Sequence, residues 1–520
     1  MKYTQALEMV VIIAVYVSSL KRHFMVSSIL ILIIGVLLCF LDVPVVTKRN
    51  KELGLYCRGN SDPGFLYSLL TVPTLFWIQK SCYDTSIYFD LLSTQIKSVI
   101  TVVMALSFLV VFVCLYFPVK FSWIIVLLAV ICICFDFDQM FLVVIICAFV
   151  YTTLACFAVL KICPYNFTIG EVGIIIQGFG LVVCDFGCRV FYQKNLLQSN
   201  EINSVVLIEF MLCSVVLMLV CIIPVAYYIN RLVRCGTDRL IHHFLFYFAS
   251  LLYLGFVFVF LRYYFNEHPI TWLIHFLVST KLRLFLMCYS FLLVAISFYV
   301  VFWYFTNKTA QVNIHKTIIR KIFHIIAVIL FLPVIVDVQF YSVISMMAFL
   351  LFLSVEIVRI CHIKPCGDVL NQVLTPFRDE QDEGVLILTH IYLLCGMSLP
   401  IWLHFSHDTK ACQIAFYSGI ISLGIGDTAA SVFGKLYGKT KWHSDSKKTI
   451  VGTLFSVSSQ FMFSIILIVF LLQELSSINL LRIMFCCLIT SLLEAWSSQI
   501  DNLILPLYMY MLFVSFCSHD

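Results

Sequence analysis

The sequence predicts an all-α, polytopic integral membrane protein with roughly fourteen to sixteen transmembrane helices. Hydrophobic residues make up 62% of the 520 residues, charged residues make up only 12%, and the mean hydropathy is +1.03. A soluble globular protein has about a quarter of its residues charged, because its surface faces water. Half that charge, spread along the whole chain, indicates that most of the surface faces lipid.

The first 307 residues are predicted to form an N-terminal region of many spans. A spanning helix needs about 20 mostly apolar residues. Such runs lie near 6–20, 24–41, 64–79, 98–117, 121–136, 140–160, 204–229, 241–261 and 282–306. Whether the stretch 171–192 forms a span remains open, because Glu171, Gln177, Asp185 and Arg189 interrupt its apolar sequence.

Residues 308–520 form a second predicted region, in which polar residues gather at the ends of the spans. Its apolar runs lie near 319–336, 340–360, 387–404, 411–433, 450–472, 480–496 and 503–517. An even number of spans separates each polar loop from the next, so the loops lie on one face of the membrane. Because basic residues gather in these loops, the positive-inside rule places that face in the cytosol.

The stretch 424–449 carries the most distinctive pattern of the chain. Gly424, Gly426, Gly434 and Gly438 remove side chains from a segment that is otherwise helical in pattern. Glycine allows a backbone to break or to approach a ligand closely, and freed N–H groups can hold phosphate. The glycines therefore predict a phosphate-binding segment.

Asp427 is the one acid in this glycine-rich part of the stretch. A charge within a span costs about 2.5–3.5 kcal/mol at the bilayer centre, so the carboxylate should be paired or bound to a cation. A Mg²⁺ ion held by one or two carboxylates and substrate phosphates would satisfy it. Asp427 is thus the predicted metal ligand, with general base as the open alternative.

Five lysines follow Asp427 in the chain, namely Lys435, Lys439, Lys441, Lys447 and Lys448. Phosphoryl transfer requires charge neutralisation and a metal, so glycines, acid and lysines together favour a nucleoside triphosphate site. The residue order is not that of a Walker A loop. Alternatively, the lysines bind anionic lipid headgroups, at about 1 kcal/mol each.

Polar residues at the other span ends are candidates for orienting the substrate or the metal. They are Arg320, Lys321, His324, Glu356, His390, Glu494, Asp501 and Asn502. The competing interpretation of Arg320 and Lys321 is a pair of interfacial anchors. Glu356 and Arg359, three residues apart, could instead form a local ion pair.

Several separate segments between about residues 315 and 510 resemble the dolichol kinase family. They include Gly426-Asp-Thr-Ala-Ala-Ser-Val-Phe-Gly434, and the segments 377–384, 386–394, 396–403, 447–449 with 452–453, and 494–507. The first three hundred residues match that family only in hydrophobic character.

The resemblance implies a catalytic region at 308–520 that transfers the γ-phosphate of CTP to dolichol. It implies a divalent metal, Mg²⁺ or Ca²⁺, and an endoplasmic reticulum membrane protein that supplies dolichyl phosphate for N-glycosylation and related glycan and GPI assembly. It places CTP binding at about 424–452, in the cytosolic loop that includes Trp442, Thr449 and Gly452. Lys447 and Lys448 would neutralise phosphates, and Trp442 would stack on cytosine.

The sequence is also compatible with two other functions. A related CTP-dependent lipid kinase would act on phytol or diacylglycerol. A transporter would explain the many spans, but it predicts paired discontinuous helices in the two halves, and one glycine-rich break is evident. The net charge of +5 is modest and gives no reason to expect a nucleic-acid partner.

Overall fold

The computed structural model describes most of the C-terminal region and separate parts of the N-terminal region. The described residues are 64–82, 139–192, 239–265, 268–306, 316–375, 384–404, 410–442, 448–472, 477–497 and 499–517, with isolated positions 10, 12, 57–58, 100–101, 104–105, 214, 378 and 382. Within these residues the elements are helical, and the sole extended pairing is an isolated bridge between Lys441 and Thr449. The all-α prediction is confirmed.

The described helices of the N-terminal region are α4 (Phe65–Cys82), α7 (Gln139–Ile162), α8 (Ile169–Tyr192), α10 (Arg239–Phe265), α11 (Pro269–Val278) and α12 (Lys281–Thr306). The ambiguous stretch 171–192 is helical, and its buried Gln177 donates to the Ser68 carbonyl oxygen at 2.8 Å. Helix α11 was not predicted; Pro269 at its first position has the backbone angle that starts a helix. The predicted spans 24–41 and 121–136 lie outside the described residues, and those near 6–20, 98–117 and 204–229 are represented by isolated positions.

The C-terminal region contains α14 (Lys316–Phe331), η1 (Leu332–Val336), α15 (Val338–Ile360), α16 (Gly367–Leu374), α17 (Thr389–His404), α18 (Thr428–Tyr437), α19 (Ile450–Leu467), η5 (Ile468–Leu472), α20 (Ser477–Trp496) and α21 (Asp501–Cys517). The predicted span 411–433 is not one α-helix. It comprises the 3₁₀-helix η3 (Lys410–Tyr417), the π-helix η4 (Ile420–Asp427) and the start of α18. A π-helical turn is rare in helices and frequent at functional sites.

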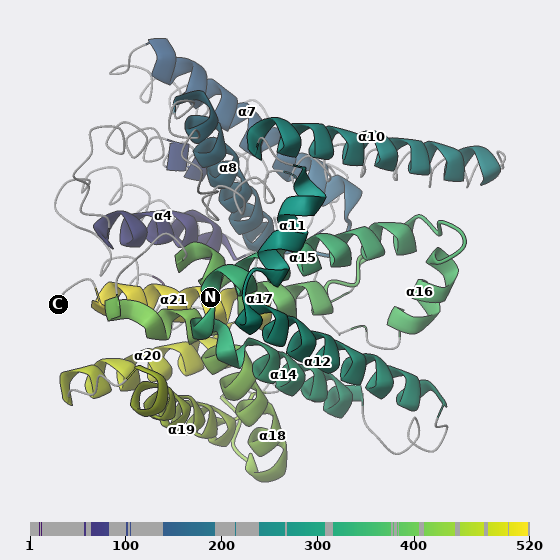
Figure 1. Ribbon diagram of the computed structural model, residues 1–520. Helices are drawn as coiled ribbons and strands as arrows, with labels where there is room; N and C mark the ends of the chain where they lie inside the picture. Colours follow the sequence, from purple (N-terminus) through teal and green to yellow (C-terminus); the bar gives the residue numbers. More distant parts are fainter. Residues whose placement is uncertain are drawn as a thin grey trace.

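Helix α21 is the buried centre of this region. It packs against α17, α20, η3 and η4, and it also contacts α4 from the N-terminal region (Figure 1). Residues 503–514 of α21 are buried along their whole length. Helix α18 packs along α19, α19 packs against α20, and α14 contacts η4. These contacts bring the ends of η4, α20 and α21 together.

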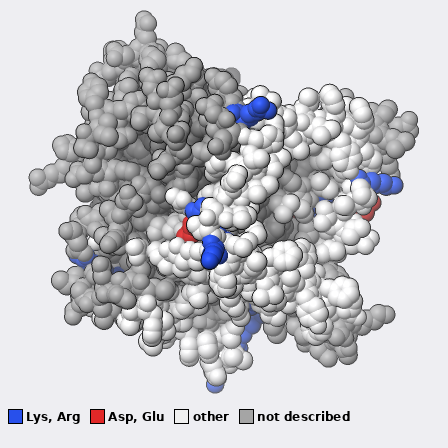
Figure 2. Space-filling model, viewed as in Figure 1, with Lys and Arg blue, Asp and Glu red and all other residues white. Residues whose placement is uncertain are grey.

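Three described helices are long and apolar enough to cross a membrane, namely Lys281–Tyr304, Val338–Ile360 and Ile450–Phe470. Shorter apolar helices occur at Val150–Ile162, Ile169–Val183, His243–Val259, Lys321–Val336, Thr389–Leu403 and Asp501–Phe516. Large apolar side chains such as Phe291 and Phe298 on α12 are exposed. Charged side chains are sparse on the described part of the face in Figure 2. This is the surface expected of a protein surrounded by lipid.

Candidate active site

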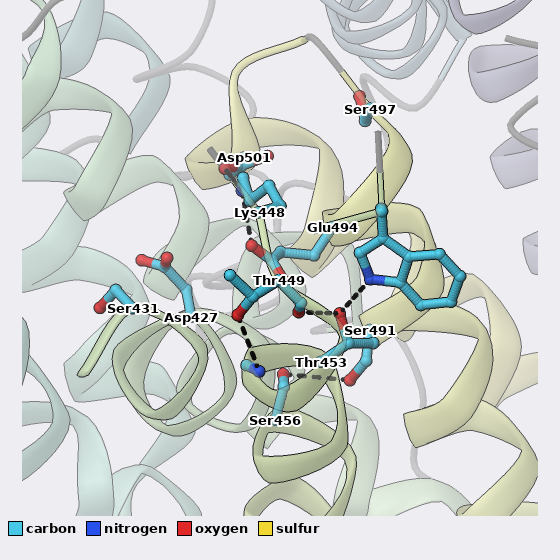
Figure 3. A network of polar contacts seen from close by, with 12 residues as sticks. Asp427, Ser431, Lys448, Thr449, Thr453, Ser456, Ser491, Glu494, Ser497 and Asp501 are labelled. Atoms are coloured by element: carbon cyan, nitrogen blue, oxygen red, sulfur yellow. Dashed lines mark hydrogen bonds and ion pairs between the residues drawn. The ribbon is translucent and has the colours of Figure 1, made fainter. Parts of the chain in front are cut away.

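Three carboxylates converge where η4 ends, α20 ends and α21 begins. One carboxylate oxygen from each of Asp427, Glu494 and Asp501 lies within 4.8 Å of the other two (Figure 3). We call these three residues the acidic cluster. Like charges at this separation repel, so the cluster requires cations to remain ionised.

Two lysines neutralise part of this charge. The Nζ atom of Lys448 lies 2.5 Å from Glu494 Oε1 and 2.9 Å from Asp501 Oδ2. The Nζ atom of Lys321 lies 2.6 Å from Asp427 Oδ2, and His324 Nε2 lies 3.8 Å from the same oxygen. Among the described side chains, three carboxylates thus face two ammonium groups, and one negative charge remains for a protonated His324 or a bound cation to balance.

The charge of Lys448 depends on these carboxylates. Burial alone would lower its pKa, because a buried ammonium group loses hydration. The neighbouring Asp501, Glu494 and Asp427 outweigh burial and raise the pKa of Lys448 above its ordinary value. The side chain therefore stays positively charged beside the acidic cluster.

The loop between α18 and α19 positions Lys448. Its two sides pair through Trp442 N–H to Lys448 O at 3.3 Å and Ile450 N–H to Thr440 O at 3.0 Å. Thr449 then caps α19, since its side-chain oxygen accepts the Gly452 N–H at 3.1 Å. This short pairing fixes the backbone at Lys448 and Ile450.

Trp442 is held by protein contacts in the same loop. Its indole N–H donates to Thr453 Oγ1 at 2.9 Å. Its ring meets the ring of Trp496 edge to face, with centroids 5.6 Å apart. The structure therefore gives Trp442 a role in anchoring the loop to α19 and α20.

The predicted glycines lie at close helix contacts. A Cβ on Gly452 would be 2.7 Å from Ala430 O, and one on Gly434 or Gly438 would be 2.9 Å or 2.4 Å from Thr449 Oγ1. On Gly426 a Cβ would lie 2.0 Å from Gln460 Nε2, and on Gly424 it would lie 2.1 Å from Val328 Cγ2. The chain stays helical through Gly424 and Gly426, as a π-helix without a break. Small residues at these positions allow the helices to approach one another closely.

The other residues predicted to bind the nucleotide or the substrate are exposed, lie at the start of α21 or are not described. Lys435, Lys439 and Lys441 are exposed. Asn502 is the second residue of α21 and is half-buried. Lys447 lies outside the described residues, and Arg320 belongs to α14 with a side chain that is not described.

Glu356 and His390 are not part of the acidic cluster. Glu356 Oε1 lies 2.7 Å from Arg359 and accepts the Ile387 N–H at 2.6 Å, so the local ion pair is confirmed. It fixes the segment that leads into α17. The ring of His390 meets Phe352 edge to face at 5.3 Å, and its buried Nε2 has no hydrogen-bond partner within the described structure.

The N-terminal region makes a contact next to the acidic cluster that was not predicted. Buried Arg58 and Glu171 form an ion pair at 2.6 Å, and Glu171 Oε1 also accepts the Ile500 N–H at 3.1 Å. One signal was present in the sequence, because Thr168-x-x-Glu171 has the spacing of a capping box. That motif does not show that Glu171 also accepts a hydrogen bond from the Ile500 N–H.

The chain is similar to proteins of one family. The family model described as dolichol kinase matches residues 58–480. Dolichol kinase from Mus musculus is 37% identical over 272 residues, covering 50% of this chain and 51% of the relative. Dolichol kinase from Homo sapiens is 36% identical over 277 residues, covering 51% of each chain. Dolichol kinase EVAN from Arabidopsis thaliana is 34% identical over 252 residues, covering 48% of this chain and 43% of the relative.

The chain spans about half the length of the curated relatives it matches. No solved structure matches it.

Proposed function

Because the chain belongs to the dolichol kinase family, we propose that it transfers the γ-phosphate of CTP to the hydroxyl group of dolichol, giving dolichyl phosphate. The observation that carries this proposal is the meeting of the acidic cluster with Lys321 and Lys448. Phosphoryl transfer depends mainly on positioning and on stabilising charge, and this site supplies both kinds of charge on fixed helix ends.

The acidic cluster fits a divalent cation. Asp427, Glu494 and Asp501 offer three carboxylate oxygens within 4.8 Å of one another, and Mg²⁺ and Ca²⁺ prefer such ligands. The net negative charge of the described side chains at the site also favours a bound cation. When bound, the cation would neutralise phosphate oxygens of CTP.

The ion pair of Asp427 favours one of its two candidate roles. Lys321, at 2.6 Å, stabilises the ionised carboxylate and so makes it a poorer acceptor for a proton. An ionised carboxylate is the form that binds a metal. We therefore assign Asp427 to the metal rather than to the proton of the dolichol hydroxyl group.

The lysines divide into two groups under this proposal. Lys448 is held at the acidic cluster and would bind the β- and γ-phosphates together with its neighbour Lys447. Lys435, Lys439 and Lys441 are exposed and would raise the local concentration of the anionic nucleotide.

We further propose that the protein lies in the endoplasmic reticulum membrane with this site at the cytosolic face. The site is formed at helix ends, beside apolar helices. Dolichol could then keep its chain in the bilayer while its hydroxyl group reaches the acidic cluster. Dolichyl phosphate made there would serve N-glycosylation and related glycan assembly.

The test is conversion of dolichol to dolichyl phosphate by membranes that carry the protein, with γ-labelled CTP and Mg²⁺. Asp427→Ala should abolish product at unchanged protein abundance. The matched control is Asp337→Asn, because Asp337 also pairs with a cation, Arg283 at 2.6 Å, but lies beyond α14 and η1 at the start of α15. Equal use of ATP, or full activity in Asp427→Ala, would contradict the mechanism. Equal phosphorylation of phytol or diacylglycerol would favour the related lipid kinases.

A further inference from the structure

A buried polar network links the first turn of α8 to the residues just before Asp501. Glu171 Oε1 accepts from Arg58 at 2.6 Å and from the Ile500 N–H at 3.1 Å, and its Oε2 accepts the Thr168 N–H at 2.9 Å. Glu171 is fully buried, with 0% exposure, and Arg58 is 6% exposed. A carboxylate this deeply buried is stable only when its oxygens are bonded, and this one is bonded at both.

A second bond fixes the adjacent residue. Thr168 Oγ1 donates to Gln499 Oε1 at 2.6 Å and accepts the Glu171 N–H at 3.2 Å. Gly64, at φ +71°, lies so close to Gln499 that a Cβ would be 2.6 Å from its Oε1. The consecutive residues Gln499 and Ile500 are therefore both held by the N-terminal region.

One peptide bond, between Ile500 and Asp501, connects this network to the acidic cluster. Ile500 O accepts the N–H groups of Leu503 and Ile504, each at 3.1 Å, and so starts α21. Glu171 thus binds Ile500 on its N–H side, while the first turn of α21 binds it on the carbonyl side. Asp501 follows directly, so its position relative to Glu494 at the end of α20 depends on where Ile500 is held.

We propose that Glu171 is a positioning residue for Asp501. It fixes the backbone at Ile500, directly before α21, so that the Asp501 carboxylate faces Asp427 and Glu494. The inference rests on the proposed function in one respect, namely that the acidic cluster binds a divalent cation. It gives the N-terminal region a part in building the site, although the predicted catalytic residues all lie in the C-terminal region.

The experiment measures metal binding by the full chain, purified in detergent, without nucleotide or lipid substrate. The protein is titrated with Mn²⁺ alone, and free Mn²⁺ is measured by electron paramagnetic resonance. Glu171→Gln keeps the size of the side chain but removes its charge. It should weaken Mn²⁺ binding about 10-fold, as loss of a residue that supports metal ligands commonly does.

Two further variants separate positioning from general destabilisation. Thr168→Val removes the bond to Gln499 with little change in volume and should weaken Mn²⁺ binding by a smaller factor. Asp337→Asn is the matched control, because Asp337 also accepts from an arginine, Arg283 at 2.6 Å, and from a backbone N–H, that of Phe340 at 2.9 Å. It should leave the Mn²⁺ affinity unchanged.

Wild-type Mn²⁺ affinity in both Glu171→Gln and Thr168→Val would overturn the proposal, as would an equal loss in Asp337→Asn. If Glu171→Gln does not accumulate, Thr168→Val decides alone. Dolichol phosphorylation by the wild type is assayed separately. A chain that binds Mn²⁺ in a Glu171-dependent way but phosphorylates no dolichol would contradict the proposed function and leave the positioning role standing. A wild type that binds no Mn²⁺ would overturn the positioning role.

Discussion

The Nζ atom of Lys321 lies 2.6 Å from the carboxylate of Asp427, and both side chains are largely buried. This ion pair joins α14, the first described helix of the C-terminal region, to the end of η4. Removing Lys321 would take away the cation at 2.6 Å from Asp427 in a poorly hydrated site and leave His324 Nε2, at 3.8 Å, facing the carboxylate. Such a loss is generally more costly than removal of an exposed pair.

Lys321→Met should therefore lower the rate of dolichol phosphorylation about 100-fold, the size of effect seen when one charge-stabilising group is removed from an active site. Asp427→Asn should lower the rate by a larger factor, to a residual rate that can still be measured. The double variant should be no worse than Asp427→Asn, because both changes act on one interaction. A double-mutant cycle on kcat/KM measures this, and fully additive losses would contradict coupling between the two residues.

Lys448 gives a second prediction, since it contacts two carboxylates of the acidic cluster. Lys448→Met should lower kcat about 100-fold, whereas Lys448→Arg should retain part of the activity because the charge is kept. Combined replacement of exposed Lys439 and Lys441 by Met should instead raise the KM for CTP and weaken its dependence on salt. Steady-state kinetics at two ionic strengths separates the two effects. Equal losses of kcat in both variants would contradict the division between the lysines.

Removal of divalent metal tests the acidic cluster directly. Chelation should abolish phosphorylation, and added Mg²⁺ should restore it. Glu494→Gln and Asp501→Asn should each raise the Mg²⁺ concentration for half-maximal activity, because each removes one carboxylate ligand. The measurement is a Mg²⁺ titration at saturating CTP. Wild-type Mg²⁺ dependence in both variants would exclude these residues as ligands.

The even number of predicted spans between the polar loops, which we call span parity, predicted which residues could share a face of the membrane. The structure shows which of these residues are in contact. Lys321, near the start of one predicted span, lies beside Asp427 of the stretch 424–449, and Lys448 of that stretch lies beside Glu494 at the end of another span. Glu356 has the same parity but belongs to another network, with Arg359. Parity places a residue at one end of a helix, whereas its neighbours depend on the rotation and lateral position of that helix. Those are set by packing, which a single sequence does not show.

The role of Glu171 shows a different limit. Its capping bond to Thr168 is local and can be inferred from spacing. Its bond to the Ile500 N–H crosses 329 residues of chain and involves a backbone group with no side-chain signature. Gly424 and Gly426 likewise indicated an unusual segment by their residue type. Their neighbours on other helices, Val328 and Gln460, are known only from the structure.

Asn166-Phe-Thr168 has the sequence of an N-glycosylation site, and it should carry no glycan. The Asn166 side chain is 2% exposed, its Nδ2 donates to Leu386 O at 2.9 Å, and its Oδ1 accepts the Val385 N–H at 2.9 Å. Treatment with an endoglycosidase should leave electrophoretic mobility unchanged. Asn166→Gln should destabilise the protein by about 1–3 kcal/mol, since buried backbone groups lose their partner. A glycosidase-sensitive band that Asn166→Gln removes would contradict this burial.

Close packing at Gly426 can be tested with an alanine pair. Gly426→Ala should destabilise the protein by about 1–3 kcal/mol, because the new Cβ would lie 2.0 Å from Gln460 Nε2 and force α19 away from η4. Gly178→Ala on α8 is the matched control, since its Cβ would meet nothing within 4 Å, and it should be neutral or slightly stabilising. Adding Gln460→Ala to Gly426→Ala should recover part of the lost stability by freeing the space. Thermal unfolding in detergent measures all three variants, and equal melting temperatures for Gly426→Ala and Gly178→Ala would show that the contact between η4 and α19 is not tight.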